Sequence, residues 1–197
     1  VSEDGRYIIV FNGEIYNYKE IRYELEQLGH NFLSDGDTEV LLGAYCEWGE
    51  KCVDRFNGMF AFAIMDTGDN SCAEKLFFAR DRAGEKPFYY RHSYGEFEFA
   101  SELKAFTRAN DLDFHALNHY LALGYVPFDL CLVKGIKKLL PGHAGLFKYS
   151  EGEIDTWRYW QLPENHARDG IDGEQLAQES WALIKDSVRL RYRSDVP

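Results

Sequence analysis

Four short apolar runs between positions 59 and 100 limit the folds open to this chain more than any other feature of the sequence. Gly, Asn and Pro residues separate the runs by connections too short for crossover helices, so the runs predict antiparallel strands. Their almost continuous apolarity indicates burial on both faces of a sheet. We therefore predict an α+β fold, a four-layer sandwich of two antiparallel sheets flanked by helices. The expected strands cover residues 59–66, 75–80, 88–91 and 96–100.

Apolar residues at helical spacing predict two helices before these strands. Asn17 resembles a helix cap, and Ile21, Leu25 and Leu28 follow at helical spacing until Gly29 ends the pattern. A second helix is expected to begin at Asp37, whose carboxylate can cap the free amides of its first turn. The other expected elements are a strand over 6–11 that stops at a turn, helices over 102–107 and 115–123, and strands over 145–149 and 153–159.

The character of the chain changes near Gln161. Residues 163–170 are polar and typical of a linker, and residues 173–192 follow as a predicted helix with one apolar face. We predict a first domain over residues 1–160, with 161–197 forming a linker and the start of a second domain.

Composition and charge argue against several classes of partner. Lys and Arg total 22 against 33 Asp and Glu, a net charge of -11, which argues against nucleic acid. The longest apolar runs are far shorter than the roughly 20 residues of a membrane-spanning helix. Residues 1–6 contain no initiator Met and no signal-peptide pattern, so we interpret the start as an internal cut. Four cysteines without CxxC spacing indicate reduced thiols in a cytoplasmic protein and no zinc site: Cys46, Cys52, Cys72 and Cys131.

The dipeptide Asn12-Gly13 is the sharpest candidate for chemistry. A side-chain amide and a glycine backbone amide are adjacent there, and two such N–H donors can converge on one oxyanion. In a well-studied protease one donor of this kind contributes roughly 2.7–4 kcal/mol of transition-state stabilisation. The alternative is a plain hairpin turn, which the dipeptide by itself favours. The residues alone leave both interpretations open.

The segment over residues 11–18 resembles the signature of N-terminal-nucleophile glutamine amidotransferases, specifically of the asparagine-synthetase branch. Further motifs of that family occur in the family's order, so the resemblance covers nearly the whole chain. Several ordered motifs are more specific than one loop match. They lie at residues 34–40, 56–62, 80–90, 99–105, 135–143 and 193–197.

The resemblance implies roles for four residues. Asn12 and the amide of Gly13 would form the oxyanion hole, and Glu14 would line the glutamine pocket. Asp37 would hold the α-ammonium group of the substrate glutamine, a charge-assisted contact; a helix cap contributing about 1 kcal/mol is the alternative for this carboxylate. Family members use an N-terminal Cys as nucleophile, which Val1 cannot replace, and we assign no catalytic role to the four cysteines of the chain because none has a free α-amine.

The resemblance also implies the reaction of the intact protein. Glutamine would be hydrolysed here through a cysteinyl thioester, and ammonia would pass internally to a β-aspartyl-AMP intermediate on a second, α/β synthetase domain. Aspartate, ATP and Mg²⁺ would bind on that domain, and we assign no metal or ATP ligand to this segment. A homodimer is compatible with this assignment. Two alternatives stay open: a related amidotransferase with another acceptor, of the polysaccharide-cluster or β-lactam-forming type, and a non-catalytic module of the same fold.

Two other patterns carry weaker signals. We interpret residues 80–90 as a structural turn between strands, with contact to the second domain as the alternative for Arg80, Arg82 and Lys86. His115 and His119 are four residues apart on an expected helix, a spacing that can bind zinc, but no third ligand accompanies them.

Overall fold

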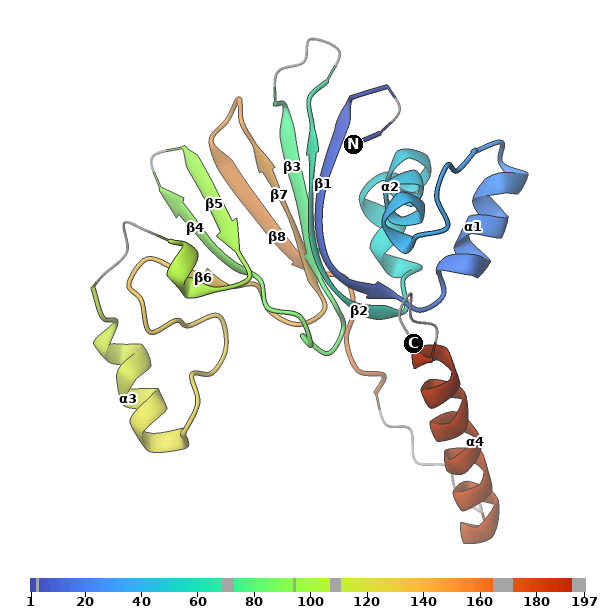
Figure 1. Cartoon of the computed structure of the whole chain (residues 1–197). Helices are drawn as coiled ribbons and strands as arrows, with labels where there is room; N and C mark the ends of the chain where they lie inside the picture. The colour runs from blue at the N-terminus through green and yellow to red at the C-terminus, as the bar shows by residue number, and fades with distance from the viewer. Residues whose placement is uncertain (3, 69–72, 94, 107–110, 165–171, 193–197) are drawn as a thin grey trace.

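The computed structural model describes residues 1–2, 4–68, 73–93, 95–106, 111–164 and 172–192. Its strands are β1 (Tyr7–Ile15), β2 (Gly58–Asp66), β3 (Lys75–Arg80), β4 (Tyr89–Ser93), β5 (Glu96–Ala100), β6 (Lys137–Lys138), β7 (His143–Lys148) and β8 (Glu153–Arg158). They form two antiparallel sheets, with strand orders β1-β2-β3-β7-β8 and β5-β4-β6 (Figure 1). The prediction of two antiparallel sheets is confirmed.

The helices are α1 (Tyr18–Gln27), α2 (Asp37–Trp48), α3 (Phe114–Leu123) and α4 (Gly173–Arg191), with 3-10 turns η1 (Gly49–Asp54) and η2 (Leu103–Ala105). The helix expected over 102–107 is therefore only the short turn η2 within the described residues. Parts of three other expectations lie outside them: residues 165–171 of the linker, residues 193–197 and Cys72. The domain boundary near residue 160 stays a prediction.

The first strand is longer than predicted. Instead of stopping before Asn12, β1 stays in register with β2 from the pair Tyr7–Asp66 to the pair Ile15–Gly58. The expected turn at Asn12-Gly13 is thus wrong, because the tertiary pairing with β2 carries this dipeptide inside a strand.

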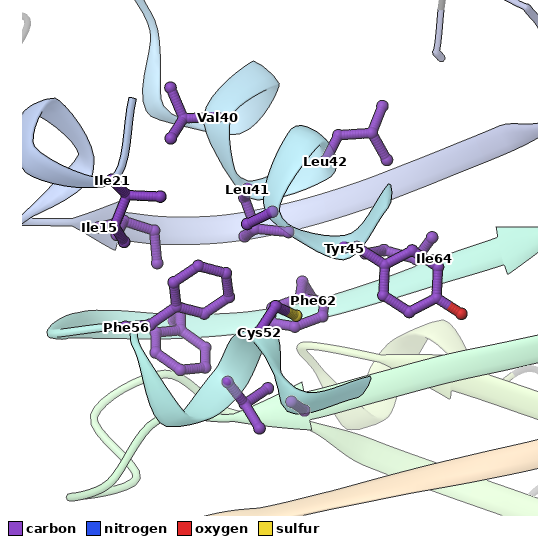
Figure 2. Close-up of a cluster of buried hydrophobic side chains, with 14 of the residues drawn as sticks. Ile15, Ile21, Val40, Leu41, Leu42, Tyr45, Cys52, Phe56, Phe62 and Ile64 are labelled. Carbon is purple, nitrogen blue, oxygen red and sulfur yellow. The ribbon is translucent and has the colours of Figure 1, made fainter. Parts of the chain in front are cut away.

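The main core lies between the larger sheet and helices α1 and α2, which cover one of its faces (Figure 1). Figure 2 shows Leu41 and Tyr45 of α2 beside Phe62 and Ile64 of β2. All four are buried. Burial of each such side chain stabilises the fold by about 1.5–3 kcal/mol relative to exposure, so this helix-to-sheet contact fixes β1 and β2 as a rigid base for the site.

Aromatic rings fill the space between the two sheets. Phe78 of β3 stacks on Phe88 at 5.3 Å between ring centroids, and Phe97 of β5 stacks on Phe147 of β7 at 5.4 Å. On the other face of the smaller sheet, Tyr89 packs in a small cluster with residues of η2 and of the segment after α3. The layers are thus helices, larger sheet, smaller sheet and a partial outer cover.

The cap expected at Asn17 takes a different form. Its side chain makes no cap hydrogen bond to α1. Instead its Nδ2 donates to Arg55 O at 2.9 Å, and its Oδ1 accepts from Asn57 N–H at 2.9 Å. The amide therefore joins the start of α1 to the loop before β2, and α1 forms because Ile21 and Leu25 are buried in the core.

Asp66, at the end of β2, is a buried carboxylate with 2% exposure. Arg6 Nε donates to its Oδ1 at 2.8 Å, and Gly68 N–H donates to the same oxygen at 2.9 Å. Burial alone raises the pKa of Asp66, but these hydrogen bonds outweigh burial and hold the pKa below its ordinary value. The folded state therefore stabilises the ionised Asp66 carboxylate more than the unfolded state does.

This shift predicts a pH-dependent contribution to stability. A lowered folded-state pKa stabilises the fold above the unfolded pKa of about 3.9, and that contribution is lost as the pH falls through the folded pKa. We expect Asp66→Asn to lower the free energy of unfolding at pH 7, with a difference from wild type that shrinks below about pH 4. Urea unfolding from pH 7 to pH 3 measures it. A difference independent of pH would contradict the prediction.

None of the helices in the described part of the chain is long and apolar enough to cross a membrane.

Candidate active site

The pairing of β1 with β2 determines where the backbone N–H of Gly13 points. Gly13 lies opposite Phe60 in the register with β2. Phe60 N–H donates to Asp81 Oδ2 at 3.2 Å, and Phe60 O accepts from Asp81 N–H at 2.8 Å. Because both polar groups of Phe60 face away from β1, Gly13 and Phe60 form a non-hydrogen-bonded pair. The Gly13 N–H therefore points away from β2, toward the outer edge of the sheet.

Only glycine fits at position 13. Its φ is +149°, and a Cβ there would lie 2.1 Å from Met59 O and 2.7 Å from Phe60 Cα. Both atoms belong to the backbone of β2 and cannot yield without breaking the ladder. Glycine is thus required by the close approach of two strands, and the reason is not the hairpin turn that the dipeptide by itself favoured.

Asp37 lies at the same edge of the sheet. Its Oδ2 accepts a hydrogen bond of 2.9 Å from Ile15 N–H. Since Ile15 is two residues beyond Gly13, the period of a strand sends both amides off the same edge. The second helix begins at Asp37, as predicted, but its N-cap residue is Gly36, so Asp37 does not occupy the cap position. The carboxylate instead bridges the start of α2 and the end of β1.

Asn12 and Glu14 share one face of β1. The neighbouring side chains Phe11 and Ile15 pack in the helix-side core, so alternation along the strand places Asn12 and Glu14 on the opposite face. Asn12 is exposed, and its Nδ2 lies 3.4 Å from Ser101 Oγ, just after β5. Glu14 is half-buried. The structure thus brings the four predicted site residues to one end of β1.

A second carboxylate, which the sequence analysis missed, fixes the loop that leads to Asp37. Glu39 accepts hydrogen bonds from Leu33 N–H at 2.8 Å and from Ser34 N–H at 2.7 Å. Burial raises the pKa of Glu39, but its hydrogen bonds with Ser34 and Leu33 outweigh burial and lower the pKa overall. An Asp at the first and a Glu at the third position of a helix, after a polar loop, is the pattern that could have indicated this role.

The turn after β3 is organised by Asp81, which is fully buried. Its Oδ1 accepts from the amides of Ala83 at 3.0 Å and Glu85 at 2.9 Å, and its Oδ2 accepts from Lys86 N–H at 3.0 Å as well as from Phe60. One side chain therefore holds the turn and also ties it to the β2 residue that faces Gly13. The sequence analysis quoted this segment as a motif but gave Asp81 no role.

Arg80 belongs to the same internal network. Its guanidinium donates to the carbonyl oxygens of Lys86, Leu139 and Gly84 at 2.6–2.7 Å. The structural interpretation of this turn fits these contacts, because the three carbonyls hold the arginine head inside the molecule.

The described thiols do not suit catalysis. Cys52 and Cys131 are buried and Cys46 is exposed, and burial raises the pKa of all three thiols, that of Cys46 to about 11, which disfavours the reactive thiolate. His115 and His119 contact each other edge-to-face on α3 at 4.8 Å. Across the residues that the structure describes, no group of three His, Cys, Asp or Glu side chains could hold a metal ion.

The chain belongs to the glutamine amidotransferase domain family, whose model matches residues 1–160. It is 40% identical over 197 residues to the glutamine-hydrolysing asparagine synthetase 3 of Bacillus subtilis, covering 97% of this chain and 31% of that protein. It is 38% identical over 198 residues to asparagine synthetase 1 of the same bacterium, covering 99% of this chain and 30% of the relative. The chain thus spans about a third of the length of these relatives.

A solved structure supports the fold. The glutamine phosphoribosylpyrophosphate amidotransferase of B. subtilis superposes with a TM-score of 0.54 at 18% identity, over 85% of this chain and 31% of that one. At this identity the likeness concerns the fold, and it agrees with the predicted α+β sandwich of the N-terminal-nucleophile hydrolase type.

Proposed function

We propose that this domain binds glutamine and supplies the oxyanion hole for its hydrolysis to glutamate and ammonia. The observation that carries the proposal is the shared edge of β1, where the Gly13 amide is directed outward and the Asp37 carboxylate is held by Ile15 N–H at 2.9 Å. A donor for a developing negative charge and an acceptor for a substrate ammonium thus lie on one side of one strand.

The spacing along β1 suits the length of glutamine. Two residues of an extended strand separate the Gly13 and Ile15 amides by roughly 7 Å. The α-nitrogen and the carboxamide carbon of glutamine are four bonds apart, or about 5 Å in an extended chain of bonds near 1.5 Å. The distance between the Gly13 amide and the Ile15 amide, which holds the Asp37 carboxylate, is therefore comparable with the length of the substrate.

The proposed roles of these residues follow the steps of glutamine hydrolysis. A nucleophile attacks the carboxamide carbon of glutamine, and the charge that develops on its oxygen is stabilised by Asn12 Nδ2 and Gly13 N–H. Ammonia leaves, and water then hydrolyses the acyl intermediate to glutamate. Asp37 holds the α-ammonium throughout, and Glu14 lines the pocket. The nucleophile expected for this family is an N-terminal cysteine, and no cysteine of this segment takes that role.

For the whole protein we propose glutamine-dependent asparagine synthesis, with ammonia transferred to an ATP-activated aspartate. The printed names of the relatives support this, and the chain covers about a third of each. Aspartate, ATP and Mg²⁺ would bind outside this segment. A cytoplasmic location and a homodimer are part of the same proposal. An acceptor other than aspartate, or a non-catalytic role, is the alternative.

The decisive experiment uses the complete protein with glutamine, aspartate and ATP. Formation of asparagine together with glutamate and AMP is the expected result. Glutamate without asparagine would retain the glutaminase and indicate another acceptor. Failure to release glutamate would overturn the proposed activity and favour the non-catalytic module.

Asp37→Asn tests the ammonium contact separately from the structural one. Asparagine keeps an oxygen that can accept from Ile15 N–H, but it removes the negative charge. Since a hydrogen bond to a charged group contributes about 1.5–3 kcal/mol, we expect kcat/KM for glutamine to fall by about 10- to 150-fold. The matched control is Asp35→Asn, two residues earlier in the loop before α2, with a fully exposed side chain. Equal kcat/KM for both variants would contradict the ammonium role.

A further inference from the structure

One arginine near the end of α4 contacts the region of the candidate site. The guanidinium carbon of Arg191 lies 5.1 Å from the centroid of the Tyr16 ring, and its Nη2 lies 4.0 Å from Glu85 Oε1. In Figure 1 the C-terminal end of α4 lies below the end of β1. None of the described residues of α4 is buried, so these contacts of Arg191 are notable on a helix that otherwise faces outward.

Tyr16 connects Arg191 to the end of β1. It is 4% exposed and directly follows Ile15, whose N–H holds Asp37. Its own N–H donates to Asn57 O at 2.8 Å, which anchors it to the loop before β2. Burial raises the pKa of the Tyr16 hydroxyl and Glu85 adds to this rise, whereas Arg191 opposes it. Arg191 is therefore close to both the Tyr16 ring and the Glu85 carboxylate.

Glu85 links the same contact to the turn after β3. Its backbone amide donates to Asp81 Oδ1 at 2.9 Å, and Asp81 also binds the amide of Phe60 opposite Gly13. Arg191 thus lies beside two segments: Tyr16 adjoins Ile15, whose N–H binds Asp37, and Glu85 is joined through two hydrogen bonds of Asp81 to Phe60, which lies opposite Gly13. The Tyr16 segment leads to Asp37, and the Glu85 segment leads to Gly13.

We propose that Arg191 is a positioning residue for glutamine binding: by holding Tyr16 and Glu85 together, it fixes the end of β1 where the Ile15 amide orients the Asp37 carboxylate. This inference rests on the proposed function. It makes α4, which follows the expected linker, a determinant of glutamine affinity. Displacement of α4 then weakens glutamine binding without removing a catalytic group.

The chain offers a matched pair of arginines for the test. Arg189 lies on the same helix and pairs with Asp186 of that helix at 3.0 Å. Arg191→Met removes the guanidinium that faces Tyr16 while keeping a long side chain, and Arg189→Met removes an equal charge that faces solvent. Arg191→Lys keeps the positive charge but loses the planar group.

Steady-state kinetics of the complete protein with glutamine should separate the roles. For Arg191→Met we expect KM to rise about two- to fivefold, the range that a partly exposed cation–π contact supports, with kcat within about twofold of wild type. Arg191→Lys should recover part of the rise, and Arg189→Met should match wild type. An unchanged KM in Arg191→Met, a fall in kcat alone, or an equal effect of Arg189→Met would overturn the inference.

Two further measurements keep the test independent of folding and of turnover. Thermal unfolding midpoints of the two Met variants should agree, and a lower midpoint for Arg191→Met alone would assign the contact to stability instead. Calorimetric titration with glutamine, carried out in the Asn12→Ala background that slows hydrolysis, gives the affinity with little turnover. If the wild-type protein binds glutamine but releases no glutamate, the proposed activity fails while the affinities still decide the role of Arg191. Absence of binding to wild type would overturn both.

Discussion

Asn12→Ala is expected to lower kcat for glutamine hydrolysis by about 100- to 1000-fold, the loss typical of removing one oxyanion-hole donor. The Asn12 side chain donates to the charge that develops in the transition state, so KM should change little. Stability should also change little, because Asn12 is exposed and its hydrogen bond to Ser101 Oγ is long, at 3.4 Å. Glutamate release by the complete protein, measured together with thermal unfolding, checks both expectations.

Val10→Ala is the control for a general disturbance of β1. Val10 lies two residues before Asn12 on the same face of the strand and is 58% exposed. Its truncation should leave kcat close to wild type. If Asn12→Ala were as active as Val10→Ala, the oxyanion role of Asn12 would be excluded, and a fall in both would assign the effect to the strand.

Asp81→Asn should give the largest loss of stability. The buried carboxylate accepts four backbone amides, two on each oxygen. An asparagine replaces one oxygen with an NH₂ group, which faces two N–H donors and leaves them unsatisfied. At about 1–3 kcal/mol for each buried unsatisfied group, we expect the free energy of unfolding to fall by about 2–6 kcal/mol. Total stabilities are about 5–15 kcal/mol, so this loss is severe.

Urea unfolding at pH 7 measures this effect. The control Asp155→Asn neutralises an exposed aspartate on β8 and should stay within about 0.5 kcal/mol of wild type. A small loss in Asp81→Asn would mean that the turn after β3 does not depend on this carboxylate. Because Asp81 also binds the Phe60 amide opposite Gly13, activity measured below the unfolding temperature should fall as well.

The regular elements were predicted well where a local pattern is strong. Apolar spacing located α1: Ile21 and Leu25 are buried as expected, whereas Leu28, the third residue of the pattern, is the C-cap residue and is exposed. The strand-like runs became β2 to β5: the bounds of β3 and β5 are those predicted, and those of β2 and β4 differ by one or two residues. The two-residue strand β6 was missed, since two lysines carry no strand pattern. Of the helix expected over 102–107, the described residues form only the turn η2, next to a small cluster that contains Leu103 and Phe106.

At the starts of α1 and α2, hydrogen bonds to residues distant in sequence formed instead of the predicted side-chain caps. Both Asn17 and Asp37 have the composition of helix caps, yet neither side chain caps its helix. Asn17 bonds to Arg55 and Asn57 instead, and Asp37 accepts from Ile15 N–H. A capping preference of about 1 kcal/mol is easily outweighed when a partner distant in sequence offers a hydrogen bond in a half-buried position.

The sequence by itself determined the α+β class, the approximate strands and helices, and the identity of the candidate residues Asn12, Gly13, Glu14 and Asp37, because apolar periodicity and ordered motifs are local properties. Only the tertiary structure decided how those residues act together. The direction of the Gly13 amide depends on which partner Phe60 binds, and the place of Asp37 depends on a contact 22 residues away in the chain. Hydrogen bonds between distant segments produce no periodic pattern in a sequence. They can be identified only from the strand register and burial of the folded structure.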